Sequence, residues 1–313
     1  MPKLIFLFLD GAGIGRREPE NPFFSARADW LPFFDPGPGL PDGTPVKAIS
    51  CDLGISGVPQ SATGQTALFT GLSGVALADR HQNGFPDRAL RRIIVRHNIF
   101  RKLKELGVRG KFINAYPLFA DTFTNSHVRI EEDGRFRFAS DFPHQFRKMI
   151  SVTTCMLIAG GERPGGENDI VAGRALYQDY SNASLTSRGL RLPEYSPEKA
   201  AEIIHGISRE FDFILYEYFQ TDLYAHRRTL GECRELVSGL NRLVGTLVSR
   251  LDRRRETLVI TSDHGNLEDL SVRHHTANRV PLIAWGKDGD RLRKRIEGIE
   301  DVTPEIAGIF ARS

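Results

Sequence analysis

A buried strand followed at once by ligand-type side chains is the feature that most constrains this chain. Residues Thr257–Thr261 (TLVIT) are apolar and β-prone, which predicts a buried strand. Asp263 and His264 stand just past its end, and His274 and His275 follow before a second apolar run. A carboxylate and an imidazole at the carboxyl edge of a strand can hold a divalent metal. A polar turn with chance histidines explains the stretch equally well on its own, because turns collect Asp, Asn and Gly.

The N-terminal segment has the same arrangement. Leu4–Leu9 is a continuous apolar run, typical of a strand covered on both faces, and Asp10 follows it directly. The glycines of Gly11–Gly15 suggest a dinucleotide-binding loop, but Arg16 occupies the position of its third glycine. The residues that follow, up to Pro22, cannot open a helix cleanly. The sequence therefore favours Asp10 as a metal ligand at a strand end.

Ser61 stands where a helix is expected to begin. Small residues follow it, and Gly71 ends the segment. In one interpretation Ser61 is simply the N-cap of that helix. In the other, the positive end of the helix stabilises an alkoxide or a phosphoryl group on the serine hydroxyl. Both interpretations stay open at this point.

Two more candidate ligands follow another predicted strand, Phe211–Tyr216. Asp222 and His226 are four residues apart, so on a helical turn both side chains point to one face. The next predicted helix, at about 230–251, has its leucines and valines at helical period, and it is interpreted as core packing.

The candidate ligands form one set because loops after parallel strands of a doubly wound sheet converge on one edge. Mixed Asp and His sets suit Mn²⁺ or Zn²⁺ better than Ca²⁺, and seven ligands match a two-metal site. Ser61 is then the catalytic nucleophile as well as a ligand. The candidate metal ligands are Asp10, Ser61, Asp222, His226, Asp263, His264 and His275.

Five motifs, in this order, resemble those of the alkaline phosphatase superfamily, and within it the metalloenzyme branch of phosphopentomutase and cofactor-independent phosphoglycerate mutase. The resemblance covers the core at both ends of the chain. The motifs are FLDGAG (Phe8–Gly13), SATGQ (Ser61–Gln65), DLYAHRR (Asp222–Arg228), SDHGN (Ser262–Asn266) and HTANRVPL (His275–Leu282).

The resemblance implies a division of the ligands between two metal ions. It assigns Asp222, His226 and His275 to one ion, and Asp10, Asp263 and His264 to the other. Ser61 is implied to be the nucleophile and a bridging ligand, and His275 is favoured over His274. Two divalent ions are expected, Mn²⁺ first and Zn²⁺ as the alternative.

The expected fold is α/β, with a doubly wound, alkaline-phosphatase-like core sheet flanked by helices. Residues 1–84 and 200–313 are predicted to form this metal-binding core, and residues 85–199 a smaller inserted α+β cap domain. The cap departs from the mutases: it is far shorter than the phosphoglycerate mutase insert, and its substrate-binding arginines have no clear counterparts here. Gln60 and Gln65 also replace residues of the mutase motif. The mutase substrates therefore do not carry over.

The expected function is two-metal phosphoryl transfer from a small phosphomonoester through a phosphoserine, as a phosphatase, phosphotransferase or mutase. One alternative is a phosphodiester or sulfate-ester hydrolase on the same core. The other is a non-catalytic, metal-binding regulatory protein.

Bulk properties exclude other classes. The chain has 313 residues and a net charge of +3, which gives no strong field for nucleic acid. Three scattered cysteines argue against a disulfide framework and for a reducing cytoplasm. No segment is long and apolar enough to span a membrane, so neither a membrane nor nucleic acid is an expected partner. The sequence leaves the oligomeric state open.

Overall fold

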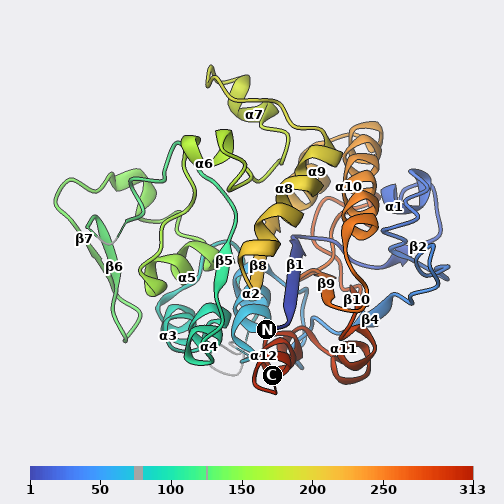
Figure 1. Cartoon of the computed structure of the whole chain (residues 1–313), viewed down its shortest axis with the longest axis horizontal. Helices are drawn as coiled ribbons and strands as arrows, with labels where there is room; N and C mark the ends of the chain where they lie inside the picture. Colours follow the sequence, from blue (N-terminus) through green and yellow to red (C-terminus); the bar gives the residue numbers. More distant parts are fainter. Residues whose placement is uncertain (74–79, 125, 313) are drawn as a thin grey trace.

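The computed structural model describes residues 1–73, 80–124 and 126–312. In these residues the main sheet has six strands in the order β4-β10-β9-β1-β8-β5 (Figure 1). β1 pairs in parallel with β8 and β9, and β5 pairs in parallel with β8, whereas β10 is antiparallel to β9 and β4. The strands are β1 (Lys3–Leu9), β4 (Lys47–Ile49), β5 (Gly110–Phe112), β8 (Phe213–Tyr218), β9 (Glu256–Thr261) and β10 (Val280–Gly286).

The sheet is buried on both faces, which explains the continuous apolar runs. Alternate side chains of a strand point to opposite faces. Phe6 and Phe8 of β1 belong to one hydrophobic cluster, while Ile5 and Leu7 belong to another on the other side. The predicted α/β core, a mostly parallel sheet flanked by helices, is confirmed.

A layer of helices packs against each face of the sheet and contributes side chains to the cluster on that face. One cluster packs β1 against α1 (Pro22–Ser25), α8 (Pro197–Glu210) and α10 (Leu230–Arg250). The other packs it against α2 (Ser61–Thr70), α3 (Arg88–His97), α4 (Ile99–Glu105), α5 (Val152–Gly160), α11 (Gly289–Arg295) and α12 (Val302–Phe310). The remaining elements are α6 (Glu167–Val171), α7 (Ala183–Thr186), α9 (Gln220–Arg227), the 3₁₀ turns η2 (His144–Phe146) and η3 (Ile299–Asp301), and the small pairs β2 (Gly15–Arg16) with β3 (Phe34–Asp35) and β6 (Val128–Ile130) with β7 (Phe136–Phe138).

The segment 85–199 is not separate from the sheet. β5, which lies inside this segment, forms the edge strand beside β8. The β6–β7 hairpin projects from the far side of the segment (Figure 1). The division into a core at 1–84 and 200–313 and a cap at 85–199 stays a prediction, but the core sheet draws a strand from within the proposed cap.

The segment Phe85–Leu106 contains two helices, α3 and α4, which meet at Asn98. Asn98 has an extended backbone, and its side chain accepts a hydrogen bond from the Arg101 amide at 3.1 Å, which caps α4. An Asn at this position competes with the helical hydrogen bonds and starts a new helix.

The described part of the chain contains no helix that is both long and apolar enough to cross a membrane. Cys51, Cys155 and Cys233 are all buried and unpaired.

The parallel strands β1, β8 and β9 end at one edge of the sheet, and their following segments carry the candidate ligands. Asp10 follows β1, α9 with Asp222 follows β8, and Asp263 follows β9. Neighbouring parallel strands therefore place these three carboxylates together, as the sequence predicted.

Candidate metal centre

The first turn of α2 places Ser61 against the loop after β9. Ser61 is the first residue of the helix rather than its N-cap, which is Gln60. Its hydroxyl oxygen lies 3.0 Å from His264 Nε2. Gly64 permits this approach, because a Cβ on Gly64 would lie 2.8 Å from the Asp263 carbonyl oxygen. The hydroxyl is therefore turned toward the histidine and does not cap the helix.

Two amides in the first turn of α2, those of Ala62 and Thr63, are not free to bind a phosphoryl group. The Ala62 and Thr63 amides both donate to the Gln82 carbonyl, at 3.0 and 3.3 Å. The segment at Gln82 thus crosses the helix start and uses these donors. These two positions can therefore stabilise a phosphoryl group only through the helix dipole and not through hydrogen bonds from their amides.

Asp10, Asp263 and His264 form one compact group of potential ligands. One ligand atom from each lies within 4.8 Å of the others, and all three side chains are buried. His264 Nε2 is 3.3 Å from Asp10 Oδ1 and 3.5 Å from Asp263 Oδ2. These three residues are the set that the resemblance assigned to one ion.

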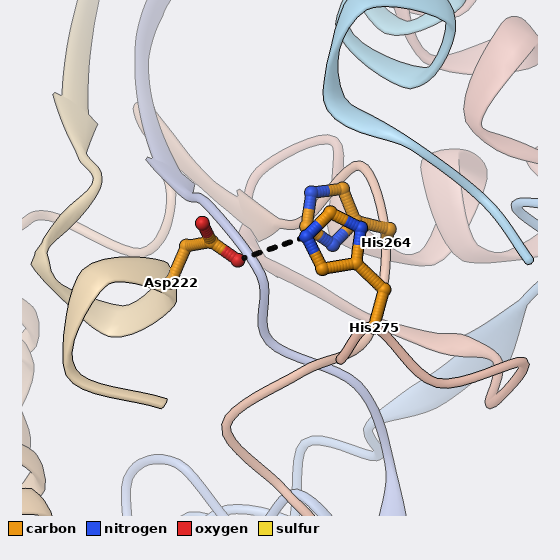
Figure 2. Close-up of side chains that lie close together, drawn as sticks. All are labelled: Asp222, His264 and His275. Carbon is orange, nitrogen blue, oxygen red and sulfur yellow. Dashed lines mark ion pairs between the residues drawn. The ribbon is translucent and has the colours of Figure 1, made fainter. Parts of the chain in front are cut away.

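A second compact group contains Asp222, His264 and His275 (Figure 2). His275 Nε2 is 3.4 Å from Asp222 Oδ1, and the rings of His264 and His275 stack with centroids 3.8 Å apart. His226 lies one helical turn after Asp222, with Nε2 3.5 Å from Asp222 Oδ2. The structure thus brings all the candidates together, but it puts His264 rather than His226 in the compact group with Asp222.

Two histidines are held with a nitrogen lone pair toward the site. His226 Nδ1 lies 3.1 Å from the Arg273 carbonyl, and His275 Nδ1 lies 3.1 Å from the Pro59 carbonyl. A carbonyl can only accept, so Nδ1 carries the proton in each ring and Nε2 keeps the lone pair that can bind a metal. In His226 this lone pair faces Asn266 Nδ2 at 3.0 Å. His274, in contrast, is exposed.

Burial and crowding of carboxylates control the titration of the first group. Burial raises the pKa of Asp10 well above its usual value, and the Asp263 carboxylate adds to this effect. Burial also raises the pKa of Asp263. For His264, burial lowers the pKa, but the Asp263 and Asp10 carboxylates outweigh burial and raise it to about 10.

In the second group the pKa of the carboxyl group is lowered rather than raised, and the pKa of one histidine is lowered as well. Burial raises the pKa of Asp222, but hydrogen bonding to His226 and the nearby His264 outweigh it and lower the pKa to about 2. Burial, followed by the charge of His264, lowers the pKa of His275 to about 4. At neutral pH the second group therefore has an ionised carboxylate beside a neutral imidazole, which is the form that binds metal.

The residues fit divalent cations. Asp10 Oδ1 and Asp263 Oδ2 are buried and have no hydrogen-bond partner among the described residues. Their polar contacts are the ion-pair distances to His264 Nε2 given above, and a bound cation would compensate the charge of these buried oxygens directly. The mixture of carboxylate oxygens and imidazole nitrogens suits Mn²⁺ or Zn²⁺.

Polar partners of these ligands include residues that the sequence reasoning did not assign. Gln65 Nε2 donates to Asp10 Oδ2 at 3.3 Å, and Asn266 Nδ2 donates to Asp222 Oδ1 at 2.6 Å. Both residues lie inside quoted motifs, so their place in the sequence was a usable signal. Two buried acids near the site, Glu217 and Glu268, had no such signal, because each is one acid among 39 acidic residues.

Part of the chain is similar to known proteins. Residues 175–312 match the model of the Metalloenzyme superfamily. The 2,3-bisphosphoglycerate-independent phosphoglycerate mutases of Clostridium tetani and Pseudomonas putida are 29% and 32% identical to the chain, over 124 and 125 residues. The family match and the mutase relatives support the metalloenzyme branch of the alkaline phosphatase superfamily. The match to the Metalloenzyme superfamily implies divalent metal ions.

The similarity to known proteins covers only part of this chain or concerns only its fold. Each mutase alignment covers 36% of this chain and 24% of the mutase, so about a quarter of the mutase length is matched. The alkaline phosphatase of the Antarctic bacterium TAB5 aligns over 100% of this chain and 99% of its own, with a TM-score of 0.54 and 13% identity. That similarity concerns the fold. The family match includes Asp222 and His275, whereas Asp10 and Ser61 lie before it.

Proposed function

We propose that this metalloenzyme transfers a phosphoryl group from a small phosphomonoester to Ser61, and from there to water or a second hydroxyl. The observation that carries the proposal is the Ser61 hydroxyl, which lies 3.0 Å from His264 Nε2 at the border of the two ligand groups. A serine in this place is beside His264, the residue that belongs to both ligand groups. A polar turn with chance histidines does not require such a serine.

Asp10, Asp263 and His264 would hold one divalent ion, and Asp222, His226 and His275 the other. Mn²⁺ is the first candidate and Zn²⁺ the second. When bound, the ions would lower the pKa of a neighbouring hydroxyl and neutralise charge on phosphoryl oxygens.

The residues of the chain supply nucleophile and orientation. The Ser61 hydroxyl gives up its proton as Oγ forms a bond to phosphorus in line with the ester oxygen, the P–O ester bond breaks, and the leaving oxygen takes up a proton. Water or an acceptor hydroxyl then gives up a proton as its oxygen bonds to phosphorus, the Ser61–phosphorus bond breaks, and Ser61 Oγ takes up a proton again. The Pro59 carbonyl keeps His275 in the ligating tautomer throughout.

Hydrolysis or transfer to a separate acceptor is favoured over mutase chemistry. A mutase must hold a second anionic group of the same molecule under a closed cap. Three arginines between residues 85 and 199 instead form ion pairs within that segment, as Arg88 with Asp133, Arg96 with Glu132, and Arg137 with Glu131. These pairs support phosphatase or phosphotransferase activity.

Turnover by the metal-loaded protein tests the proposal. The panel contains phosphomonoesters, a phosphodiester and a sulfate ester, each assayed with Mn²⁺ and with Zn²⁺. We expect Mn²⁺-dependent release of phosphate from a monoester and its loss in Ser61→Ala. Preference for the diester or the sulfate ester would indicate the alternative hydrolases. Full metal binding without turnover on any ester would indicate a regulatory metal-binding protein.

A further inference from the structure

Glu268 is a buried carboxylate behind the metal centre. Its side chain is 1% exposed. Oε2 accepts hydrogen bonds from the backbone amides of Gly13 at 2.7 Å and Asn266 at 2.8 Å. Gly13 is three residues after Asp10, and Asn266 is two after His264. This oxygen therefore joins the two segments that carry the first ligand group.

The other oxygen of Glu268 serves a different segment. Oε1 accepts from Asn278 Nδ2 at 3.0 Å and from the Thr276 hydroxyl. Thr276 directly follows His275, and its amide donates to the Gly265 carbonyl at 3.0 Å. Oε1 thus reaches the segment that presents His275 to Asp222.

The backbone is shaped to receive this carboxylate. A Cβ placed on Gly13 or on Gly265 would lie 2.4 Å from Glu268 Oε1, so any larger residue would displace the side chain. Two glycines in the ligand-bearing loops therefore leave room for the one acid that joins them.

We propose that Glu268 is a positioning residue that sets the spacing between the two ligand groups, one carboxylate oxygen serving each. This inference rests on the metal sites of the proposed function, but not on the reaction. Partners outside the coordination shell orient metal ligands, and their loss costs about 10- to 100-fold in metal affinity.

The two sides of Glu268 differ in a way that can be tested. The amides of Gly13 and Asn266 belong to the backbone, so they are kept by every substitution except proline. Thr276 and Asn278 donate through side chains, so one side can be released alone. Thr276→Val removes the hydroxyl donor to Oε1 and leaves both bonds to Oε2 in place. It should therefore weaken the ion of Asp222 and His275 and spare the other.

The experiment is a calorimetric titration of the full-length, metal-stripped protein with Mn²⁺ alone. For Thr276→Val we expect one site to weaken about 10- to 100-fold and the second to stay within about threefold. Thr276→Ser, which keeps the hydroxyl, should restore the first site. In a His275→Ala background only the ion of Asp10 and Asp263 remains, and adding Thr276→Val should leave its affinity unchanged.

The matched control is Thr257→Val at the opposite end of β9, where a buried threonine hydroxyl bonds to the Asp288 carboxylate. It should leave both Mn²⁺ affinities unchanged. If Thr276→Val does not fold, Asn278→Ala removes the other donor to Oε1 and carries the same test.

Unchanged affinities, or equal weakening of both sites, would overturn the assignment of Glu268. Because the titration measures binding without substrate, a protein that binds two ions but transfers no phosphoryl group would refute the proposed function and leave this inference intact.

Discussion

At the scale of single residues, burial decides which acids are ionised near the metal centre. Glu217 is the clearest case outside the ligand groups. It lies near the end of β8, and its carboxylate is bonded to the Thr153 hydroxyl of α5 at 2.9 Å and to the Tyr116 hydroxyl at 3.3 Å. Burial raises its pKa from 4.5 to about 8, with a further contribution from the Asp10 carboxylate. Glu217 is therefore protonated in the folded protein at neutral pH.

This shift predicts a pH-dependent difference between the protein and Glu217→Gln. Between pH 4.5 and about 8 the folded state holds a proton that the unfolded state has lost, so the contribution of Glu217 to stability falls as pH rises through this window. The groups facing Glu217 are Asp10, Tyr116 and Thr153. The glutamine side chain of the variant does not titrate. We expect the unfolding free energy, relative to the variant, to fall by at least about 1.4 kcal/mol across the window.

Urea unfolding of the metal-stripped proteins at a series of pH values measures this difference. A difference that stays constant from pH 5 to pH 8 would show that Glu217 does not titrate there.

At the scale of elements, the close contact between α2 and the loop after β9 brings Ser61 to His264. Gly64 stands in the first turn of α2, where a Cβ would lie 2.8 Å from the Asp263 carbonyl oxygen and 3.1 Å from the Asp263 Cβ. The backbone on both sides is fixed, by the helix and by the end of β9. A larger residue at 64 would therefore push the helix and Ser61 away from the site.

Gly64→Ala is predicted to destabilise the protein although alanine favours helices. Helix propensity alone would stabilise the variant by about 1 kcal/mol. Gly206 in α8 provides the control, since a Cβ there meets nothing within 4 Å. Gly206→Ala should therefore be stabilised by its higher helix propensity. Thermal unfolding of both variants measures these two changes in stability. Stabilisation of Gly64→Ala to the same extent as Gly206→Ala would contradict the proposed contact.

The elements that the sequence predicted well are those with strong local signals. The continuous apolar runs predicted β1, β9 and β10. The position of β5 in the main sheet was harder to predict, because a strand of only three residues that begins with glycine has little apolar pattern of its own. Its membership of the main sheet depends on pairing with β8, which is distant in sequence.

The candidate site was predictable as a set of residues but not as a set of distances. Which carboxylate follows which strand can be read from the sequence, and the sheet order then brings Asp10 and Asp263 together. The stacking of His264 on His275, and the grouping of His264 with Asp222, depend on the path of the loop between residues 263 and 280. The role of Gln82 at the start of α2 depends on a similar long-range approach.

At the scale of the whole molecule, the segment 85–199 shares its hydrophobic core with the rest of the chain. One cluster contains Phe6 and Phe8 of β1 together with Ile94 of α3, Phe112 of β5 and Cys155 of α5. An independent cap domain would bury its own apolar residues separately. A smaller cluster does lie wholly within 85–199, and it consists of Ala115, Ile170, Ala175, Tyr177, Leu185 and Leu192. The larger cluster nevertheless joins the segment to the main sheet, which favours one folding unit.

We therefore predict a single cooperative unfolding transition. Differential scanning calorimetry of the intact chain should give a calorimetric enthalpy equal to the van't Hoff enthalpy. Two resolved transitions, one of them belonging to residues 85–199, would show instead that the cap folds separately.

The central claim, that Ser61 carries the phosphoryl group, is tested most directly by trapping the covalent intermediate. The protein is incubated with Mn²⁺ and a phosphomonoester that it turns over, quenched in acid, and digested for peptide mass spectrometry. We predict one added phosphoryl group on Ser61, absent without Mn²⁺ and absent in Ser61→Ala. Turnover of the ester that continues in Ser61→Ala, with Ser61 unmodified in the unsubstituted protein, would contradict the claim.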